Sequence, residues 1–263
     1  MQYTLKKSLG QHFLKDEHIC KQIVAALQQQ PFAQLVEVGP GAGALTKYLL
    51  PLKGFDFKAV ELDDEKIVYL HKTFPAIAGK IIHADFLHID PPFEGNFTVV
   101  GNFPYNISSQ ILFKILDWKD QVPVVIGMFQ KEVAMRVAAK EGSKVYGIIS
   151  ILIQAYYDVE YLFDVPPESF TPPPKVMSGV IRLTRKQTHY TVKSEKAFVQ
   201  LVKMAFNQRR KMLRNAVKSL FLPDVLADPF FNKRAEQVSI EEFAALTFKM
   251  GTDDSHLNAN EVE

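Results

Sequence analysis

The chain has 263 residues, of which 47% are hydrophobic and 23% are charged. This length exceeds one average domain and the composition is typical of globular proteins, so we expect one large domain with a smaller one. The single cysteine, Cys20, excludes an intramolecular disulfide framework and a cysteine zinc cluster. We find no signal peptide and no apolar run near the roughly 20 residues that cross a bilayer, so we expect a cytoplasmic protein without membrane contact.

Strand-like and helix-like segments alternate along the first part of the chain. Apolar residues recur every fourth position over 17–30, which predicts a helix. Further on, short apolar runs predict strands at 35–38, 57–62, 80–86, 97–102 and 122–129. Helical patterns lie between them at 44–50, 108–118 and 131–140, and another helix begins at Asp63 or Asp64 as its cap. Strands that are apolar on both faces predict an α/β fold, a parallel sheet with helices on both sides.

The pattern changes near residue 186. Residues 148–163 and 176–185 read as two strands without an intervening helix, which predicts an antiparallel edge hairpin around a proline-rich loop. Helices are then expected at 195–206, 208–221 and 240–250, the last with the capping-box pattern Ser239-x-x-Glu242. We therefore predict a sheet domain over 1–185, a small all-helical domain over 186–250 and a disordered acidic tail over 251–263.

Three successive strand ends carry residues suited to an adenosine. Gly39, Gly41 and Gly43 follow the first strand, where glycines permit a sharp turn and close approach of a ligand. Glu61 ends the second strand and can accept hydrogen bonds from ribose hydroxyls. Asp85 ends the third strand and can accept from an adenine amine, with Phe86 packed on the base. Because no phosphate-binding lysine loop is present, the pattern argues against a nucleotide triphosphatase.

The fourth strand ends in Asn102-Phe103-Pro104-Tyr105. An adenine amine is a poor nucleophile, and two acceptors would favour a pyramidal nitrogen with its lone pair aimed at an incoming methyl group. The Asn102 side-chain oxygen and the Pro104 carbonyl can be those acceptors, and Tyr105 offers a face for the base. An activated sulfonium donor needs no general base, so the segment predicts positioning and polarisation as the source of catalysis.

The chain resembles the ribosomal RNA adenine dimethyltransferases that act on the small subunit. The match runs over nearly the whole length and includes SLGQHFL at 8–14, EVGPGAGALT at 37–46, the tetrapeptide at 102–105, Tyr-Gly at 146–147, FTPPPKVMS at 170–178 and QRRKMLRN at 208–215. The resemblance implies a Rossmann-like class I methyltransferase sheet, S-adenosylmethionine as cofactor and no metal. It implies dimethylation of N6 of two adjacent adenines near the 3′ end of 16S rRNA, in an immature 30S particle, by a monomer.

The resemblance also assigns roles to single residues. His12 and Leu14 match the arm that closes over the cofactor, and Gly39, Glu61, Asp85 and Asn102 match its S-adenosylmethionine contacts. Phe170 matches an aromatic residue that sandwiches the target adenine opposite Tyr105. The family usually has asparagine at position 12 and leucine at position 103, where this chain has His12 and Phe103; both fit the same roles.

A basic segment follows the predicted boundary. Residues 196–223 hold seven basic residues and no acidic one. On the predicted helices a stripe contains Lys203, Arg210, Arg214 and Lys218, and Arg209 and Lys211 adjoin it. Such a face could neutralise phosphates without reading sequence, and Lys6, Lys7 and Lys15 could extend it. A solvated helix face is the plainer interpretation of these residues taken alone, but their attachment to a base-methylating domain favours RNA.

Other functions stay open from sequence. A large-subunit (23S) adenine methyltransferase of the macrolide-resistance type shares the fold and the N-x-P-[YF] site, although the Phe170 loop and the QRRKMLRN segment favour the small subunit. DNA adenine methyltransferases commonly carry D-P-P-Y, so the tetrapeptide at 102–105 argues against this class of enzyme. A non-enzymatic ribosome assembly factor on the same fold would be expected to lose Asn102 or Glu61, and both are present.

Overall fold

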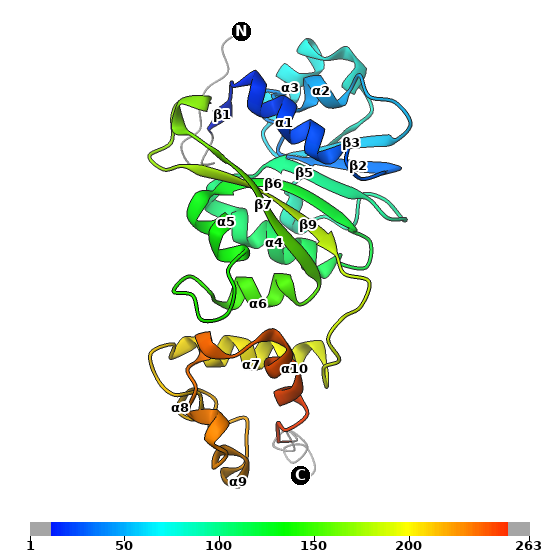
Figure 1. Cartoon of the computed structure of the whole chain (residues 1–263). Helices are drawn as coiled ribbons and strands as arrows, with labels where there is room; N and C mark the ends of the chain where they lie inside the picture. The colour runs from blue at the N-terminus through cyan, green and yellow to red at the C-terminus, as the bar shows by residue number, and fades with distance from the viewer. Residues whose placement is uncertain (1–11, 252–263) are drawn as a thin grey trace, which may run out of the picture. The chain divides into compact units, whose positions relative to one another are not determined.

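The computed structural model describes residues 12–251 as two compact units (Figure 1). The first unit comprises the described part of Met1–Ala138 together with Tyr156–Gln187. The second comprises Ala139–Ala155 and the described part of Thr188–Glu263, so a segment that the sequence placed in the sheet domain clusters with the carboxy-terminal helices. Lys6, Lys7 and the predicted tail after residue 251 lie outside the described residues.

The first unit is built on a seven-stranded sheet in the order β4-β3-β2-β5-β6-β9-β7. Its strands are β2 (Gln34–Val38), β3 (Asp56–Glu61), β4 (Ile81–His83), β5 (Thr98–Asn102), β6 (Val124–Gln130), β7 (Tyr157–Val165) and β9 (Ser178–Arg185). The first five of these pair in parallel, while β9 is antiparallel to both β6 and β7. The fold is therefore the predicted Rossmann-like α/β sheet with an antiparallel edge.

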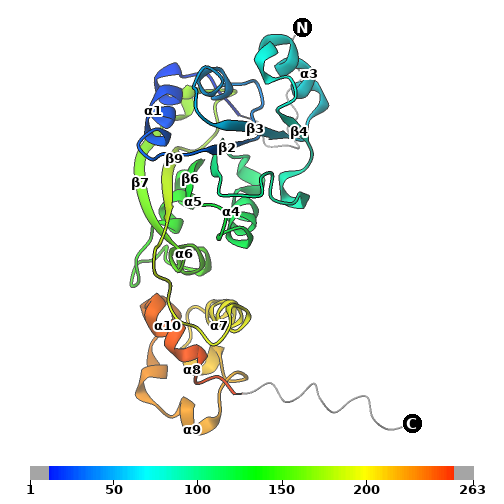
Figure 2. The ribbon, with the colours of Figure 1, turned by 90° about the vertical axis from the view of Figure 1, so that its right-hand side faces the viewer.

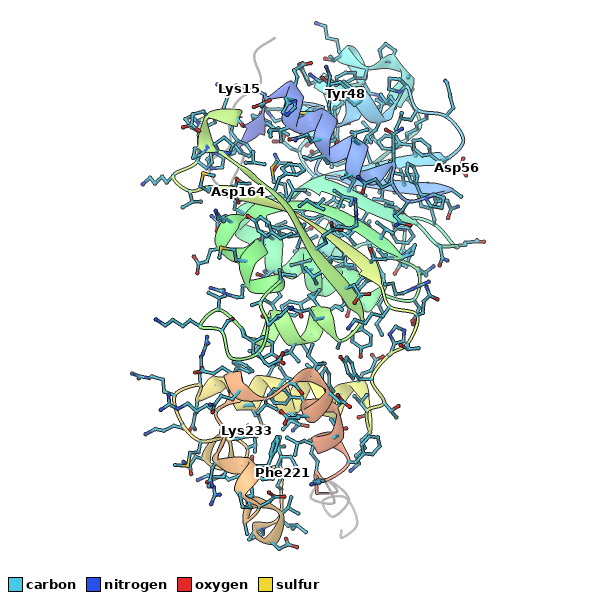
Figure 3. The ribbon with its side chains drawn as sticks, viewed as in Figure 1. Lys15, Tyr48, Asp56, Asp164, Phe221 and Lys233 are labelled. Carbon is cyan, nitrogen blue, oxygen red and sulfur yellow. The ribbon has the colours of Figure 1, made fainter. Side chains whose placement is uncertain are left out.

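Helices cover both faces of this sheet. On one side lie α1 (Glu17–Leu27), α2 (Thr46–Leu49) and α3 (Asp64–Thr73), and on the other α4 (Ser108–Asp117) and α5 (Lys131–Val137) (Figures 1 and 2). Side chains fill the layers between helices and strands (Figure 3). Central strand residues such as Val36, Val99 and Ile126 are completely buried, as expected for strands covered on both faces.

The strand order reverses beside β2. The chain runs from β2 outward through β3 to β4, then returns to place β5 on the other side of β2. Such a reversal leaves a crevice beyond the carboxyl ends of the two central strands, because their connections leave in opposite directions. The residues that end β2, β3 and β5 therefore meet at one place.

The prediction of a strand over residues 148–163 was wrong in its first half. Residues Ile148–Gln154 form helix α6 in the second unit, and the strand β7 begins only at Tyr157. Five of the seven α6 residues are buried, so burial on nearly all sides removes the polar alternation that distinguishes a helix from a buried strand.

A two-stranded ladder that the sequence did not predict ties the amino-terminal arm to the proline-rich loop. Strand β1 (Phe13–Leu14) pairs antiparallel with β8 (Phe170–Thr171), with Phe13 opposite Thr171 and Leu14 opposite Phe170. The backbone N–H of Lys15 also donates to the Ser169 carbonyl at 2.8 Å. These bonds hold residues 12–14 beside the sheet.

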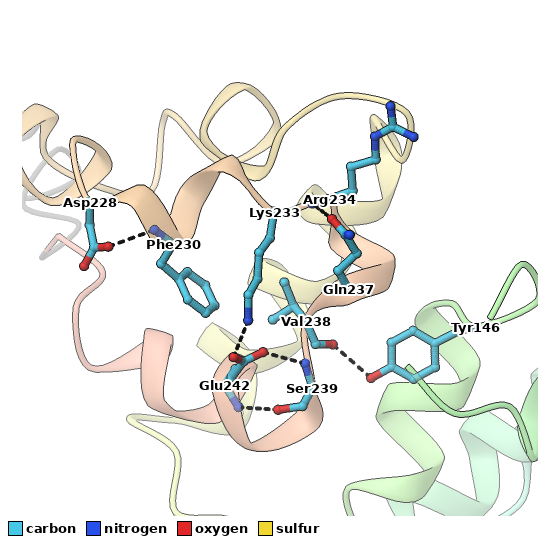
Figure 4. A network of polar contacts seen from close by, with 9 residues as sticks. All are labelled: Tyr146, Asp228, Phe230, Lys233, Arg234, Gln237, Val238, Ser239 and Glu242. Atoms are coloured by element: carbon cyan, nitrogen blue, oxygen red, sulfur yellow. Dashed lines mark hydrogen bonds and ion pairs between the residues drawn. The ribbon is translucent and has the colours of Figure 1, made fainter. Parts of the chain in front are cut away.

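The second unit is helical, as predicted. It contains α6, α7 (Glu195–Asn207), α8 (Leu213–Ala216), α9 (Pro223–Leu226) and α10 (Ile240–Thr247). The predicted capping box is present, because Ser239 Oγ accepts from the Glu242 backbone and the Glu242 carboxylate accepts from the Ser239 backbone (Figure 4). In the same network the Tyr146 hydroxyl donates to the Val238 carbonyl at 3.2 Å, which joins the α6 segment to the α10 segment.

The prediction of one helix over 208–221 was wrong. Helix α7 ends at Asn207, and Gln208 leaves the helical conformation with φ −122° and ψ 47°. Within residues 208–221, only Leu213–Ala216 is α-helical. The apolar spacing of Leu213 and Val217 persists because both side chains are buried. The basic residues between 209 and 218 therefore do not share one continuous helix face.

Candidate functional site

The crevice at the strand reversal holds a cavity of about 220 Å³ in the first unit. Its lining comes from the ends of β2, β3 and β5, the turn after β4, and the arm. The lining includes ten residues expected at a cofactor or reacting site: His12, Leu14, Gly39, Gly41, Glu61, Asp85, Phe86, Asn102, Pro104 and Tyr105. The cavity is thus the place where the sequence-predicted residues meet.

The glycine loop after β2 is shaped by two different contacts. Gly41 has φ +56°, and a Cβ there would lie 3.1 Å from the ring of Phe13, which lines the cavity from the arm. Gly43 has φ +81°, and a Cβ there would lie 2.3 Å from the ring of Phe74. Gly43 does not line the cavity, so a glycine is needed there to leave room for the Phe74 ring and not for a ligand.

Glu61 ends β3 with both carboxylate oxygens engaged by backbone N–H groups. Its Oε2 accepts from Gly41 at 3.0 Å, and its Oε1 accepts from Leu62 and Asp63 at 2.9 Å. These bonds fix the carboxylate between the glycine loop and the end of β3. Each oxygen can accept more than one hydrogen bond, so the fixed carboxylate can also receive hydroxyl donors from the cavity.

Asp85 follows β4 and caps the short 3₁₀ helix Phe86–His88. Its Oδ1 accepts from the Leu87 N–H at 2.9 Å, and its Oδ2 lies 3.0 Å from His88 Nδ1. Asp85 therefore both caps this helix and lines the cavity. Phe86 is buried and meets the only tryptophan, Trp118, edge to face at 5.2 Å between ring centroids.

Asn102 is oriented by the arm. Its side-chain nitrogen donates to the His12 carbonyl at 3.1 Å, and the same residue closes β5 in register with Met128 of β6. Phe103, which follows, is 1% exposed and packs into space left by Gly101 and Gly127, where a Cβ would lie within 2.7 Å of its ring. Phe103 is thus an apolar filler, as expected for this position.

Pro104 begins the 3₁₀ turn Tyr105–Ile107. Its carbonyl, the second predicted acceptor, accepts the Ile107 N–H at 3.2 Å. A carbonyl oxygen has two lone pairs, so one remains for a substrate amine. The hydrogen bond from Ile107 also fixes the direction of this carbonyl.

Tyr105 is held at its hydroxyl and covered on its ring. Its hydroxyl lies 2.5 Å from the Oγ of Ser178, a residue with no exposed surface at the start of β9. The ring stacks on His12 with 5.5 Å between centroids. Burial raises the pKa of Tyr105, partly offset by the Ser178 contact, so the phenol stays neutral near neutral pH. Ser178 was noticed only within a motif, and no local sequence signal links it to Tyr105.

Phe170 is not brought to the cavity. It lies in β8 opposite Leu14, has no exposed surface and belongs to the hydrophobic core. The expectation that Phe170 forms the wall opposite Tyr105 therefore does not match this arrangement, because its ring is buried in the core and does not line the cavity. The ring that faces Tyr105 is His12.

Glu37 is a cavity residue that the sequence analysis did not single out. It is 2% exposed near the end of β2, just before the glycine loop, and Thr46 Oγ1 donates to its carboxylate at 2.7 Å. Burial, reinforced by the neighbouring Glu61 carboxylate, raises the pKa of Glu37 to about 8 against the lowering effect of the Thr46 hydrogen bond. A buried acidic residue within a strand is the signal that could have identified it.

The predicted basic face separates into two groups in the second unit. Arg209 pairs with Glu236 at 2.7 Å and also donates to the Ser143 carbonyl, so it joins segments of the unit. Arg214 is partly buried, with its Nε atom out of contact with solvent. The exposed members are Arg210, Lys211 and Lys218.

Known proteins resemble the chain over nearly its whole length. The sequence profile described as ribosomal RNA adenine dimethylase matches residues 2–249. "Ribosomal RNA small subunit methyltransferase A" of Cytophaga hutchinsonii is 52% identical over 92% of this chain and 95% of the relative. The protein of the same name from Flavobacterium johnsoniae is 52% identical over 94% of this chain and 96% of the relative.

Solved structures share the fold at lower identity. A dimethyladenosine transferase from Plasmodium falciparum superposes with a TM-score of 0.73 at 24% identity, covering 88% of this chain and 94% of that one. The 23S rRNA methyltransferase ErmE superposes with a TM-score of 0.68 at 20% identity, covering 90% and 99%.

The sheet, its strand-end cavity and these relatives define an S-adenosylmethionine-dependent methyltransferase. The chain belongs to the ribosomal RNA adenine dimethylase family. The cavity fits the cofactor, because a fixed carboxylate, a glycine loop and the buried Phe86 ring line one cavity.

Proposed function

We propose that this enzyme transfers methyl groups from S-adenosylmethionine to N6 of two adjacent adenines near the 3′ end of 16S rRNA, giving N6,N6-dimethyladenosine. The observation that carries the proposal is the Asn102–Tyr105 segment at the carboxyl end of β5, in the cavity that Glu61 and Asp85 also line. The names of the relatives that are half identical to this chain support the small subunit as the source of the RNA.

The cofactor supplies a methyl group already activated on a sulfonium. The chain's residues orient the acceptor: Asn102 Oδ1 and the free lone pair of the Pro104 carbonyl each receive one N–H of the adenine amine. Donation to two fixed acceptors withdraws the nitrogen lone pair from the ring and directs it toward the methyl group. Since both acceptors are held before the base arrives, by His12 and Ile107, little reorganisation is needed.

Cofactor recognition is assigned to the strand ends. Glu61 accepts the ribose hydroxyls, Asp85 accepts the adenine amine, and Phe86 packs on the ring, while Gly39 and Gly41 permit close approach. Leu14 and His12 cover the site from the arm. Glu37 lies beneath the glycine loop, where its contact with Thr46 fixes the start of α2.

The second unit is assigned to RNA binding. Arg210, Lys211 and Lys218 are exposed and can contact phosphates, whereas Arg209 contributes by holding the fold of the unit. Specificity then comes from RNA shape and from which adenine reaches the cavity. We further propose that the enzyme acts as a monomer on an immature 30S particle, in the cytoplasm where subunits assemble.

Transfer of labelled methyl groups to purified ribosomal particles tests the proposal. Immature small subunits that lack the modification should accept label in the presence of the purified enzyme, and large-subunit RNA should not. Label in large-subunit RNA alone would instead support a macrolide-resistance-type enzyme. Binding to small subunits without any transfer would support a non-enzymatic assembly factor.

A further inference from the structure

One face of the Tyr105 ring is covered by the ring of His12. The two ring centroids lie 5.5 Å apart with an interplanar angle of 28°. That separation is typical of two rings in direct contact. A third ring does not fit between them, although the proposed function requires a purine to stack on Tyr105.

His12 contacts both residues that the base has to reach. Both residues line the cavity, and the His12 carbonyl accepts the Asn102 side-chain N–H at 3.1 Å. His12 therefore lies beside the acceptor amide as well as against the ring. A base whose amine reaches Asn102 and whose face reaches Tyr105 has to enter the space that the His12 ring fills.

The His12 ring is held by one hydrogen bond besides the stack. Its Nδ1 lies 2.9 Å from the Pro172 carbonyl in the loop after β8. A carbonyl only accepts, so Nδ1 carries the hydrogen. The contact with Asn102 uses the His12 backbone, and the ring can rotate away about its side-chain torsions while Asn102 stays oriented.

We propose that His12 is a specificity-determining residue of the base site, whose ring occupies the stacking position on Tyr105 until the target adenine takes it. The inference rests on the proposed function, which places the base on Tyr105. A base that enters must displace the His12 ring, which breaks its stack on Tyr105 and its hydrogen bond to Pro172. Adenine offsets this loss through its two N–H bonds to Asn102 and Pro104, whereas uracil, which lacks an exocyclic amine, cannot make this pair of bonds.

The test compares His12→Ala and His12→Asn, which remove the ring, with His18→Ala, an exposed histidine on α1 away from the cavity. KM and kcat are measured for methyl transfer to small-subunit RNA, and the dissociation constant for S-adenosylmethionine is measured by calorimetry. Both ring-removing variants should lower the KM for RNA about fivefold, since a stack and a hydrogen bond no longer compete. S-adenosylmethionine is kept saturating for each variant, because His12 also covers the cofactor site, and His18→Ala should match the wild type in every quantity.

The dissociation constant of the same RNA is also measured with S-adenosylhomocysteine present, so that affinity is read without transfer. An RNA affinity that is unchanged or weakened in both ring-removing variants would overturn the proposal. Failure of the proposed function would be recognised separately, because the wild-type enzyme would then transfer no methyl group to small-subunit RNA.

Discussion

The side-chain nitrogen of Asn102 donates a hydrogen bond of 3.1 Å to the backbone carbonyl of His12, 90 residues away in the chain. This bond fixes the orientation of the amide, because its nitrogen is engaged by the arm and its oxygen is turned to the opposite side. The arm itself is held by the β1–β8 ladder, so the orientation of the reacting-site acceptor depends on a strand pairing outside the main sheet.

Asn102→Ala should abolish methyl transfer while cofactor binding stays largely intact. Loss of one preorganised polar group at a reacting centre lowers kcat by roughly 100-fold or more. Single-turnover transfer and calorimetry with S-adenosylmethionine measure the two effects. Asn96→Ala, at an exposed position of the same unit, is the matched control and should behave as the wild type. Retained transfer by Asn102→Ala would refute the proposed role.

Ser178→Ala and Tyr105→Phe should have the same effect, because each removes the hydrogen bond between the two hydroxyls while leaving the Tyr105 ring in place. A hydrogen bond of this kind contributes about 1 kcal/mol, so each variant should raise the KM for RNA about fivefold with kcat nearly preserved. The double variant should be no worse than either single one. Additive effects in this cycle would show that Ser178 does not act through Tyr105.

Glu37→Gln should change how stability depends on pH. Burial raises the pKa of Glu37 from 4.5 to about 8, so the folded protein keeps a proton that the unfolded chain loses between those values. The free energy of unfolding of the wild type therefore falls as pH rises through this window, by at most about 1.4 kcal/mol per pH unit from this group. Glutamine cannot ionise, so the stability of the variant relative to wild type should increase from about pH 5 to pH 8. Denaturant titrations at several pH values measure it, and a constant difference would contradict the raised pKa.

Arg209 and Arg210 should respond differently to substitution although they are adjacent. Arg210 is exposed, so Arg210→Ala should weaken RNA binding and reduce the salt dependence of affinity by about one phosphate contact. Arg209 is paired with Glu236, so Arg209→Ala should lower the melting temperature of the protein. Glu236→Ala is the control for the second effect and should also lower it. RNA binding that is insensitive to Arg210 would remove this residue from the proposed surface.

Much of the cofactor site could be predicted from local sequence. Glu61, Asp85 and Asn102 each end a short apolar run, and parallel strands bring such ends to one edge regardless of loop details. The predicted capping box at Ser239 was confirmed for the same reason, since capping depends on residues within one helical turn.

Other features depend on contacts between distant segments and were not predictable. The pairing of Phe13–Leu14 with Phe170–Thr171 involves two short segments, and it places Phe170 in the core and His12 against Tyr105. Residues 208–221 kept the apolar spacing of a helix, yet the Arg209–Glu236 pair and the turn at Gln208 fix a different path. Contacts between distant segments decided the conformation of the β1–β8 ladder and of residues 208–221, which the local apolar pattern did not specify.

The most direct test of the account is the identity of the methylated nucleoside. Small subunits incubated with the enzyme and S-adenosylmethionine are digested to nucleosides and analysed by mass spectrometry, with Asn102→Ala in parallel. The account predicts N6,N6-dimethyladenosine from the wild type, located near the 3′ end of the small-subunit RNA, and none from the variant. Methylation of another base, or of adenine in large-subunit RNA alone, would contradict it.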